Sequence, residues 1–530
     1  MNRLGQRIAC YKTPLLLALI VMFGLALRVY QIDRESFWID EAASYWRART
    51  SPTEMIKETA KNVQAPFYYL TLHYWIKWVG DSDGAIRFLS ALFGILAIPA
   101  VFQIGKLLFH ERYGLVAALF LAVSGFHIQY SQEARPYALY FLLTSLSVLF
   151  AILAYKRTRY GWVGYIISSM LLLYTHDTAV FAVPAIVLFY LLLSWPWRRL
   201  SSILPFLLST AVVFLLYSPW IPVYARQAIR VKEDFWTSGL TVRAVLETAR
   251  TLIFFLPLAN IPSTIQYALL AVPFSILTFS LLALWARKKA LIGLVLFFLI
   301  PVGINLIVSI TIRNIFILKV LIPALLPLLL LWGTPILIEK GGLSPLCRKL
   351  ALLAMASMLL LSLVGSIEFL RHNSKEPWRQ AAEIFQKSYK PGDGVVYLLA
   401  FNERAFLRYL PSDFYDVSTV AIPTNWRRWW RGSLSGTAWI PPKLPSAHSF
   451  WKVGSRRAQP LYDTTDKTGI AALRRLKSKN IRLWLVLHPS QPDRRYQSLT
   501  TSTLAWLDEN YKNSMEWHGR NLALILYEPR

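Results

Sequence analysis

The feature that most restricts this sequence is a series of long apolar segments spread over its first two thirds. An α-helix needs roughly 20 mostly apolar residues to cross about 30 Å of hydrocarbon. The sequence predicts about eleven transmembrane helices, at 14–30, 86–108, 115–131, 136–154, 161–174, 179–195, 201–219, 265–286, 290–310, 316–338 and 350–367. One further apolar stretch, 251–262, contains Pro257 and Pro262, so we expect it to be interfacial or re-entrant.

Composition supports a polytopic α-helical membrane protein. Of the 530 residues, 55% are hydrophobic and 16% are charged, whereas soluble domains carry about 25% charged residues. Two cysteines can form neither a disulfide framework nor, on their own, a thiolate zinc site. These values exclude a soluble enzyme, a disulfide-rich secreted domain and a disordered protein.

The net charge of +28 is distributed unevenly along the chain. If the N-terminus is inside, the inner segments hold sixteen cations and only two acids, Glu111 and Glu339, while the short outer loops show no such excess. Because cytoplasmic loops collect Lys and Arg, this pattern predicts a cytoplasmic N-terminus in the plasma (inner) membrane. The first apolar run lacks a small-residue cleavage site, so we expect an uncleaved anchor.

Two outer segments are too long to be simple connections. Segment 31–85 mixes both charges with aromatic residues and predicts amphipathic helices on the outer leaflet. The C-terminal region predicts a small extracytoplasmic α/β domain, with a helix over 376–389 and strands over 394–400, 481–489 and 521–529. The predicted domains are therefore 1–367, which spans the membrane and includes the outer loop 31–85, and 368–530.

Asp40 and Glu41 are adjacent carboxylates in the sequence SFWIDEAASYWRA (36–48), just outside the first span. A carboxylate in such a place can take a proton from a hydroxyl group if burial and neighbours raise its pKa. An acidic pair can also simply begin a helix, where the helix dipole favours negative charge. The residues alone leave both interpretations open.

Further polar and aromatic clusters lie at the same predicted outer face. Ionisable groups near the membrane are costly and usually face a cavity or a partner, although capping and snorkelling pairs are the ordinary alternative. Their shared side predicts one cavity. Its members are Arg135, His176, Arg313 and Lys319, together with Trp38, Gln64, Pro66, Tyr68, Tyr69, Arg87, Glu133, Tyr137 and Asp177.

Several familiar motifs are absent from the sequence. It has no phosphate-binding GxxxxGKS loop, Rossmann glycine pattern, HExxH or GxSxG with triad partners, which argues against a nucleotide-driven pump and a soluble nucleotide-sugar site. No cofactor is indicated, and Asp40 and Glu41 alone make no metal coordination shell, although a divalent ion stays open.

The region from 368 onward holds 25 cations and 14 acids, with the basic aromatic run NWRRWWRG at 425–432. This composition is typical of nucleic-acid sites. The predicted outer location instead favours anionic headgroups or an acidic glycan or glycolipid, with a snorkelling surface as the plain alternative. We therefore expect no nucleic-acid partner.

Five motifs occur in a characteristic order: SxWxDEA after the first span, a Pro-aromatic YY segment with RxxS downstream, ExRxY, YTH at an outer turn, and KxxWRxAA…PGD. In this order they resemble the bacterial membrane glycosyltransferases of the C-type fold. Within these, the sequence is similar to the protein O-mannosyltransferase-like group, which includes the lipid A aminoarabinose transferases. The resemblance covers roughly residues 1–400.

The resemblance implies a polyprenyl or dolichyl phosphate monosaccharide as donor and transfer on the outer face with inversion. Asp40 matches the proposed general base of the family, with Glu41 in support. Arg135 and His176 match residues near the donor phosphate. Lys319-Val320 stands where relatives more often have Arg-Tyr, so Arg313 is a second candidate for the phosphate.

Physical chemistry agrees with this assignment. A polyprenyl phosphate is already a competent leaving group whose developing charge needs fixed cations, whereas an acceptor hydroxyl benefits from a positioned base. The expected acceptor is a glycolipid, a glycan or a protein. Two alternatives remain: a transporter or lipid flippase, which would place ionisable groups near the bilayer midplane, and a non-catalytic receptor or assembly factor.

Overall fold

The computed structural model describes residues 3–195, 200–234, 237, 239–254, 272–276, 278, 288–337, 344–372, 375–398, 402–416, 418–422, 467–488 and 494–530. The chain forms two compact units. The helical unit contains Met1–Ile32 and Val63–Asn373, and the sheet unit contains Asp33–Asn62 and Ser374–Arg530. Residues 33–62 therefore pack with the C-terminal residues, and the predicted boundary at 367/368 falls inside the last long helix of the helical unit.

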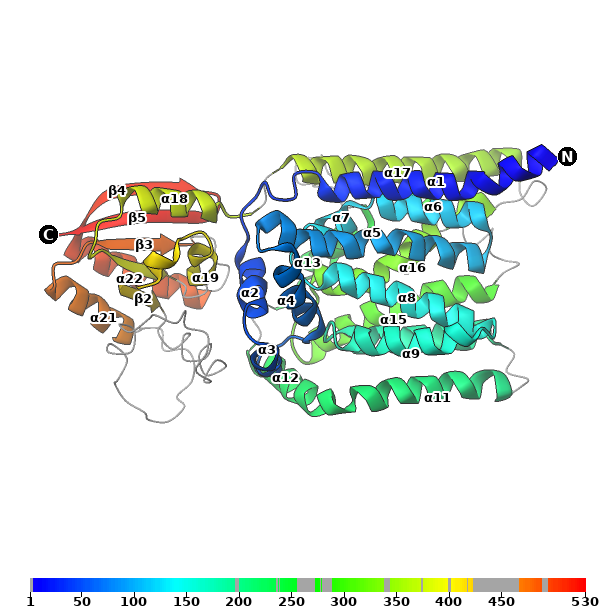
Figure 1. Cartoon of the computed structure of the whole chain (residues 1–530), viewed down its shortest axis with the longest axis horizontal. Coiled ribbons are helices and arrows are strands. Elements are labelled where there is room, and N and C mark those ends of the chain that lie inside the picture. The colour runs from blue at the N-terminus through cyan, green and yellow to red at the C-terminus, as the bar shows by residue number, and fades with distance from the viewer. Residues whose placement is uncertain are drawn as a thin grey trace. The chain divides into compact units, whose positions relative to one another are not determined.

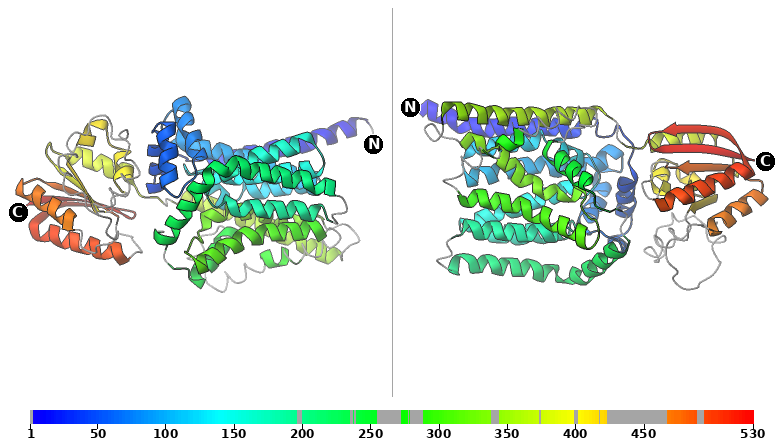
Figure 2. Two further views of the ribbon diagram at one scale, coloured as in Figure 1. Left: turned by 90° about the horizontal axis from the view of Figure 1, so that it is seen from below. Right: turned by 180° about the vertical axis from the view of Figure 1, so that it is seen from behind.

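Most long helices of the helical unit run side by side (Figures 1 and 2). Its helices are α1 (Arg3–Val29), α4 (Phe67–Val79), α5 (Asp83–Leu108), α6 (Glu111–Ala122), α7 (Gly125–Ser131), α8 (Tyr137–Tyr155), α9 (Arg159–Leu173), α10 (Ala179–Leu193), α11 (Leu200–Tyr217), η1 (Ser218–Trp220), α12 (Ile221–Asp234), α13 (Val242–Phe254), α15 (Lys288–Thr311), η4 (Leu318–Ala324), α16 (Leu325–Trp332), η5 (Thr334–Leu337) and α17 (Pro345–Arg371).

Within the described ranges, seven helices are long and apolar enough to cross a membrane, and the bent pair α6–α7 can supply an eighth. The predicted number of about eleven is too high for this part of the chain, because α9 and α10 have only 15 residues each. Most of the predicted span 265–286 lies outside the described residues, as does 251–262 beyond Phe254. The polytopic helical architecture itself is confirmed.

The bend of 60° between α6 and α7 exposes carbonyl groups that would be satisfied in a continuous helix. Two buried side chains from other helices bind them. Arg28 of α1 donates to the carbonyl oxygens of Leu121 (2.9 Å) and Ala122 (3.1 Å), and Ser366 of α17 donates to that of Val123 (2.6 Å). The break is therefore built into the packing of α1 and α17.

Segment 31–85 is helical, as predicted, and contains α2 (Ile39–Ala48), α3 (Pro52–Lys61) and α4. Ser51 begins α3, since its Oγ accepts the Glu54 N–H at 3.3 Å and Pro52 follows at the first helical position. The location of these helices on the outer leaflet stays a prediction.

The sheet unit contains one mixed five-stranded sheet of order β2-β1-β3-β5-β4. Strands β2, β1 and β3 are parallel, whereas β5 is antiparallel to both β3 and β4. The strands are β1 (Gly394–Leu398), β2 (Ser418–Ile422), β3 (Leu483–Leu487), β4 (Tyr511–Gly519) and β5 (Leu522–Pro529); the helices are α18 (Trp378–Ser388), α19 (Asn402–Leu407), η6 (Ser412–Asp416), α21 (Lys467–Ser478) and α22 (Arg494–Asn510).

Strands β1 and β3 are buried along their whole length because helices cover both faces of the sheet (Figure 1). On one face, Val396 and Leu485 pack in a core with Leu473 of α21 and Leu507 of α22. On the other, Phe385 of α18 lies 5.4 Å from Trp484, ring centroid to ring centroid. The predicted α/β domain is confirmed as a small mixed-sheet domain.

Candidate functional site

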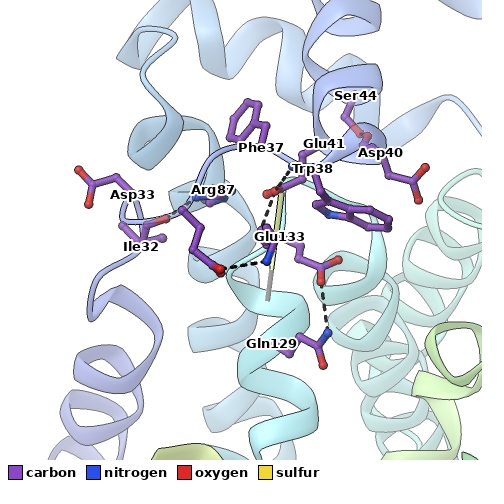
Figure 3. A network of polar contacts seen from close by, with 12 residues as sticks. Ile32, Asp33, Phe37, Trp38, Asp40, Glu41, Ser44, Arg87, Gln129 and Glu133 are labelled. Carbon is purple, nitrogen blue, oxygen red and sulfur yellow. Dashed lines mark hydrogen bonds and ion pairs between the residues drawn. The ribbon is translucent and has the colours of Figure 1, made fainter. Parts of the chain in front are cut away.

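The acidic pair lies in the first turn of α2, where the helix dipole favours negative charge (Figure 3). Trp38 is the N-cap residue, and its backbone N–H points to Glu41 Oε2 at 3.4 Å. Ser44 Oγ donates to the Asp40 carbonyl at 3.0 Å, one turn later. Glu41 thus caps the start of α2, as the helix-capping interpretation predicts. Asp40, the residue before it, lies in the same first turn.

The two adjacent carboxylates have different surroundings. Glu41 is completely buried, and its Oε2 accepts a hydrogen bond from Lys375 Nζ at 2.9 Å. Asp40 is only partly buried. A buried carboxylate is stable as an anion when a cation pairs with it. Glu41 is therefore engaged in a buried ion pair, and the partly exposed Asp40 is the better candidate for proton transfer.

In the helical unit, three predicted residues surround the ring of Tyr137. Arg135 Cζ lies 5.8 Å from the ring centroid, Lys319 Nζ lies 5.7 Å from it, and the His176 ring lies 5.7 Å away, centroid to centroid. They come from the turn before α8, the α9–α10 connection and η4. We call Arg135, Tyr137, His176 and Lys319 the Tyr137 cluster.

His176 is held as a neutral ring. Its Nδ1 accepts the backbone N–H of Thr178 at 3.2 Å, so in the neutral ring the proton is on Nε2. Tyr140 stacks parallel to it at 4.8 Å. Burial, followed by the charges of Arg135 and Lys319, lowers the pKa of His176 to about 3. At neutral pH this side chain is a hydrogen-bond donor and not a cation.

Asp177 follows in the same connection between α9 and α10. Burial raises the pKa of its carboxyl group to about 7. Its Oδ1 atom is buried and has no hydrogen-bond partner within the described ranges. This carboxyl group is therefore poised to change charge near neutral pH.

The Pro-aromatic segment lies against the Tyr137 cluster. The Tyr68 hydroxyl is 3.0 Å from Ser90 Oγ, which donates to the Arg135 carbonyl at 3.3 Å. The Phe67 N–H donates to the carbonyl of Tyr174 at 2.9 Å, at the start of the YTH turn. The segment therefore contacts the RxxS motif through Tyr68 and the YTH motif through Phe67.

Six other predicted residues also belong to the helical unit. Pro66 precedes α4 as its N-cap, and Tyr69 packs edge-on against Tyr68 at 5.6 Å. The Gln64 carbonyl accepts from Gln227 at 3.2 Å. Figure 3 shows Arg87 donating to the Ile32 carbonyl (2.9 Å) and Gln129 donating to Glu133 Oε1 (3.4 Å). Arg313 follows the end of α15.

The structure thus brings together Tyr68, Arg135, Tyr137, His176 and Lys319. Sequence reasoning missed Tyr140, although it lies one helical turn after Tyr137 on the same face of α8. It also missed Lys375, the first residue of the KxxWR motif. The described residues contain no group of three or more His, Cys, Asp or Glu side chains that could hold a metal ion.

Comparisons with known proteins concern the family and the fold of the chain. Residues 63–222 match the family model described as dolichyl-phosphate-mannose-protein mannosyltransferase, which contains most of the Tyr137 cluster. No protein among those with curated descriptions matches the chain.

Solved structures resemble the chain over nearly its whole length. ArnT from Cupriavidus metallidurans in the apo state has a TM-score of 0.58 at 13% identity, covering 96% of this chain and 97% of ArnT. The structure of ArnT bound to undecaprenyl phosphate has a TM-score of 0.56 at 12% identity, covering 96% of this chain and 97% of ArnT. The oligosaccharyltransferase AglB from Archaeoglobus fulgidus, bound to an inhibitory peptide and a dolichol-phosphate, has a TM-score of 0.53 at 13% identity, with coverage of 98% and 74%.

At these identities the structures establish a shared fold, while the sequence match carries the relation to the family. The resemblance predicted from the motifs is confirmed, and so is the enzyme class at the level of the family. The chain has the fold of the C-type membrane glycosyltransferases, and its residues 63–222 carry the sequence pattern of the polyprenyl-phosphate-sugar family that includes the dolichyl-phosphate-mannose-protein mannosyltransferases.

Proposed function

We propose that this protein transfers a monosaccharide from a polyprenyl-phosphate donor to a hydroxyl group of an acceptor, at the outer face of the plasma membrane and with inversion. The acceptor is a glycolipid, a glycan or a protein. The uneven distribution of Lys and Arg supports a cytoplasmic N-terminus and an extracytoplasmic C-terminal domain. The undecaprenyl phosphate and dolichol-phosphate in the ArnT and AglB structures support the donor class.

The Tyr137 cluster is the observation that carries this proposal. Arg135 and Lys319 bring two cations within 6 Å of one ring centroid, next to a neutral His176 that donates through Nε2. Two cations beside one ring favour the binding of an anion there. Fixed cations and N–H donors suit a departing phosphate, whose negative charge grows as the glycosidic bond breaks. Arg313 is a further candidate for the same phosphate.

Asp40 is the proposed general base. It removes the proton of the acceptor hydroxyl as that oxygen attacks the anomeric carbon, and the bond from this carbon to the phosphate oxygen breaks on the opposite face of the sugar. The electron pair leaves with the polyprenyl phosphate, so the anomeric configuration inverts. Glu41 supports the base indirectly, because it binds Lys375 and the N-terminus of α2.

A transfer assay tests this function. Purified protein in detergent is incubated with a panel of radiolabelled polyprenyl-phosphate sugars, and a membrane lipid extract supplies the acceptor. Asp40→Asn is compared with the wild type and with Asp33→Asn, which removes an exposed acid seven residues earlier. We expect product with at least one donor, no product with Asp40→Asn, and normal turnover with Asp33→Asn.

The alternatives give different results. Full activity of Asp40→Asn would overturn the assignment of the base. If no donor is turned over and reconstituted vesicles instead move a lipid or solute across the bilayer, the protein is a transporter or flippase. If the protein shows neither sugar transfer nor transport, and its role in the cell survives Asp40→Asn, it is a receptor or assembly factor.

A further inference from the structure

Lys375, at the start of the C-terminal part of the sheet unit, makes two contacts with the segment that carries the acidic pair. Its Nζ donates to Glu41 Oε2 at 2.9 Å, and its backbone N–H donates to Glu35 Oε1 at 3.0 Å. The Glu41 side chain is fully buried, and that of Lys375 is 11% exposed. This ion pair therefore lies in the interior of the unit.

Neighbouring residues hold the backbone just before α2. Arg379, in the first turn of α18, donates its backbone N–H to Ser36 Oγ at 3.0 Å. The Tyr409 hydroxyl oxygen accepts the Phe37 N–H at 2.6 Å. Residues 35–37 are thus fixed from two directions by the C-terminal part of the chain.

The far end of α2 is held in the same way. Trp46 Nε1 donates to the Arg404 carbonyl at 2.8 Å, and Arg408 Cζ lies 4.2 Å from the centroid of the Tyr45 ring. Both arginines belong to α19 and the turn that follows it. The α2 helix is therefore held at both ends by groups from residues 375–409.

The next residue joins this contact to the sheet. Glu376 Oε1 lies 3.3 Å from Nε2 of His488, which directly follows β3. Lys375 binds the acidic pair, and the adjacent Glu376 contacts the residue at the carboxyl end of the central strand β3. This arrangement ties the residue next to Lys375 to the sheet.

We propose that Lys375 is a positioning residue for the transfer reaction: by pairing with Glu41 it sets the first turn of α2 and hence the place of Asp40. This inference rests on the proposed function of Asp40. Without Lys375, the buried Glu41 carboxylate would lose the cation that binds its Oε2, and the higher cost of keeping its charge buried would favour a movement toward water. Asp40 is the adjacent residue and would move with it. A displacement of about 1 Å at a reacting group lowers turnover by on the order of 10²-fold.

The test compares four variants with the donor and acceptor found in the transfer assay. Lys375→Met should lower kcat by on the order of 10²-fold and leave KM for the lipid donor unchanged, because the donor phosphate is assigned to the helical unit. Lys375→Arg, which keeps the charge, should recover part of kcat. Glu41→Gln combined with Lys375→Met removes both charges and should raise kcat about tenfold above that of Lys375→Met alone. Lys387→Met, an exposed lysine of α18, is the matched control.

Two results overturn the proposal. One is a wild-type kcat in Lys375→Met, and the other is a double variant no more active than Lys375→Met. Melting temperatures of all variants are measured in the same detergent, and a merely structural role would lower the melting temperature of Lys375→Met while leaving kcat per folded molecule unchanged. Asp40→Asn is assayed in parallel, and its full activity would overturn the proposed base whatever Lys375→Met does.

Discussion

Arg28 Nη2 lies 2.9 Å from Nδ1 of His127, and both side chains are completely buried in the helical unit. The same guanidinium binds the last carbonyl groups of α6, whose dipole favours a cation at that end. Gly94 leaves room for it, since a Cβ atom there would lie 3.1 Å from Arg28 Nε and 2.2 Å from Ser131 Oγ. Because α7 leads directly into the turn that carries Arg135, we expect Arg28 to support the Tyr137 cluster from a distance.

Arg28→Met should therefore impair both stability and donor binding. It leaves the carbonyl oxygens of Gly24, Leu121 and Ala122 without their side-chain donor, which we expect to cost about 3 kcal/mol. The melting temperature in detergent measures the first effect, and KM for the lipid donor the second. Lys12→Met changes an exposed cation on the same helix and should alter neither. An unchanged melting temperature in Arg28→Met would contradict this role.

Arg135→Gln and Lys319→Met should each raise KM for the lipid donor about 10- to 100-fold, because each removes a cation that we propose binds the phosphate. Both substitutions should also lower kcat, since the negative charge on the phosphate grows as the glycosidic bond breaks. Initial rates over a range of donor concentrations measure both constants. Lys77→Met is a suitable control, because Lys77 also lies over a tyrosine ring (Tyr74, 5.8 Å) but is exposed. Donor kinetics that do not change in Arg135→Gln would refute the phosphate assignment.

Asp177 gives a prediction about pH. Its pKa is raised from 3.8 to about 7 by burial, so the folded protein keeps a proton that the unfolded chain has already lost. Between about pH 4 and pH 7 the folded state binds more protons, and raising the pH lowers stability. Asp177→Asn removes this penalty. The melting temperature of Asp177→Asn relative to the wild type should increase from about pH 5 to about pH 8, whereas that of Asp33→Asn should not. A constant difference would show that Asp177 titrates normally.

Much of the fold follows from local patterns in the sequence. The strands β1, β3 and β5 and the helix α18 are short apolar or amphipathic runs that can be recognised without tertiary information. Strand β4 was not recognised, because most of its residues are exposed and it lacks a continuous apolar run. The predicted spans 161–174 and 179–195 correspond to α9 and α10, which have only 15 residues each, because hydropathy does not show where a helix ends.

The site was predictable where a motif is compact. Arg135, Tyr137 and His176 were identified from short sequence patterns, and the structure brings them together. The pair Glu41–Lys375 joins residues 334 positions apart, so no local pattern could reveal it. The run NWRRWWRG at 425–432 lies outside the described residues.

The packing of α2 against residues 375–409 also sets the order in which the protein can mature. A ribosome makes the helix with Asp40 and Glu41 near the beginning of translation, and the residues that hold it, Lys375, Arg404 and Tyr409, only after the last membrane helix. Helix α2 can make these contacts only after residues 375–409 have been synthesised. A chain interrupted before residue 375 would carry every residue of the Tyr137 cluster and still lack the residues that hold α2, so we expect such a product to be inactive.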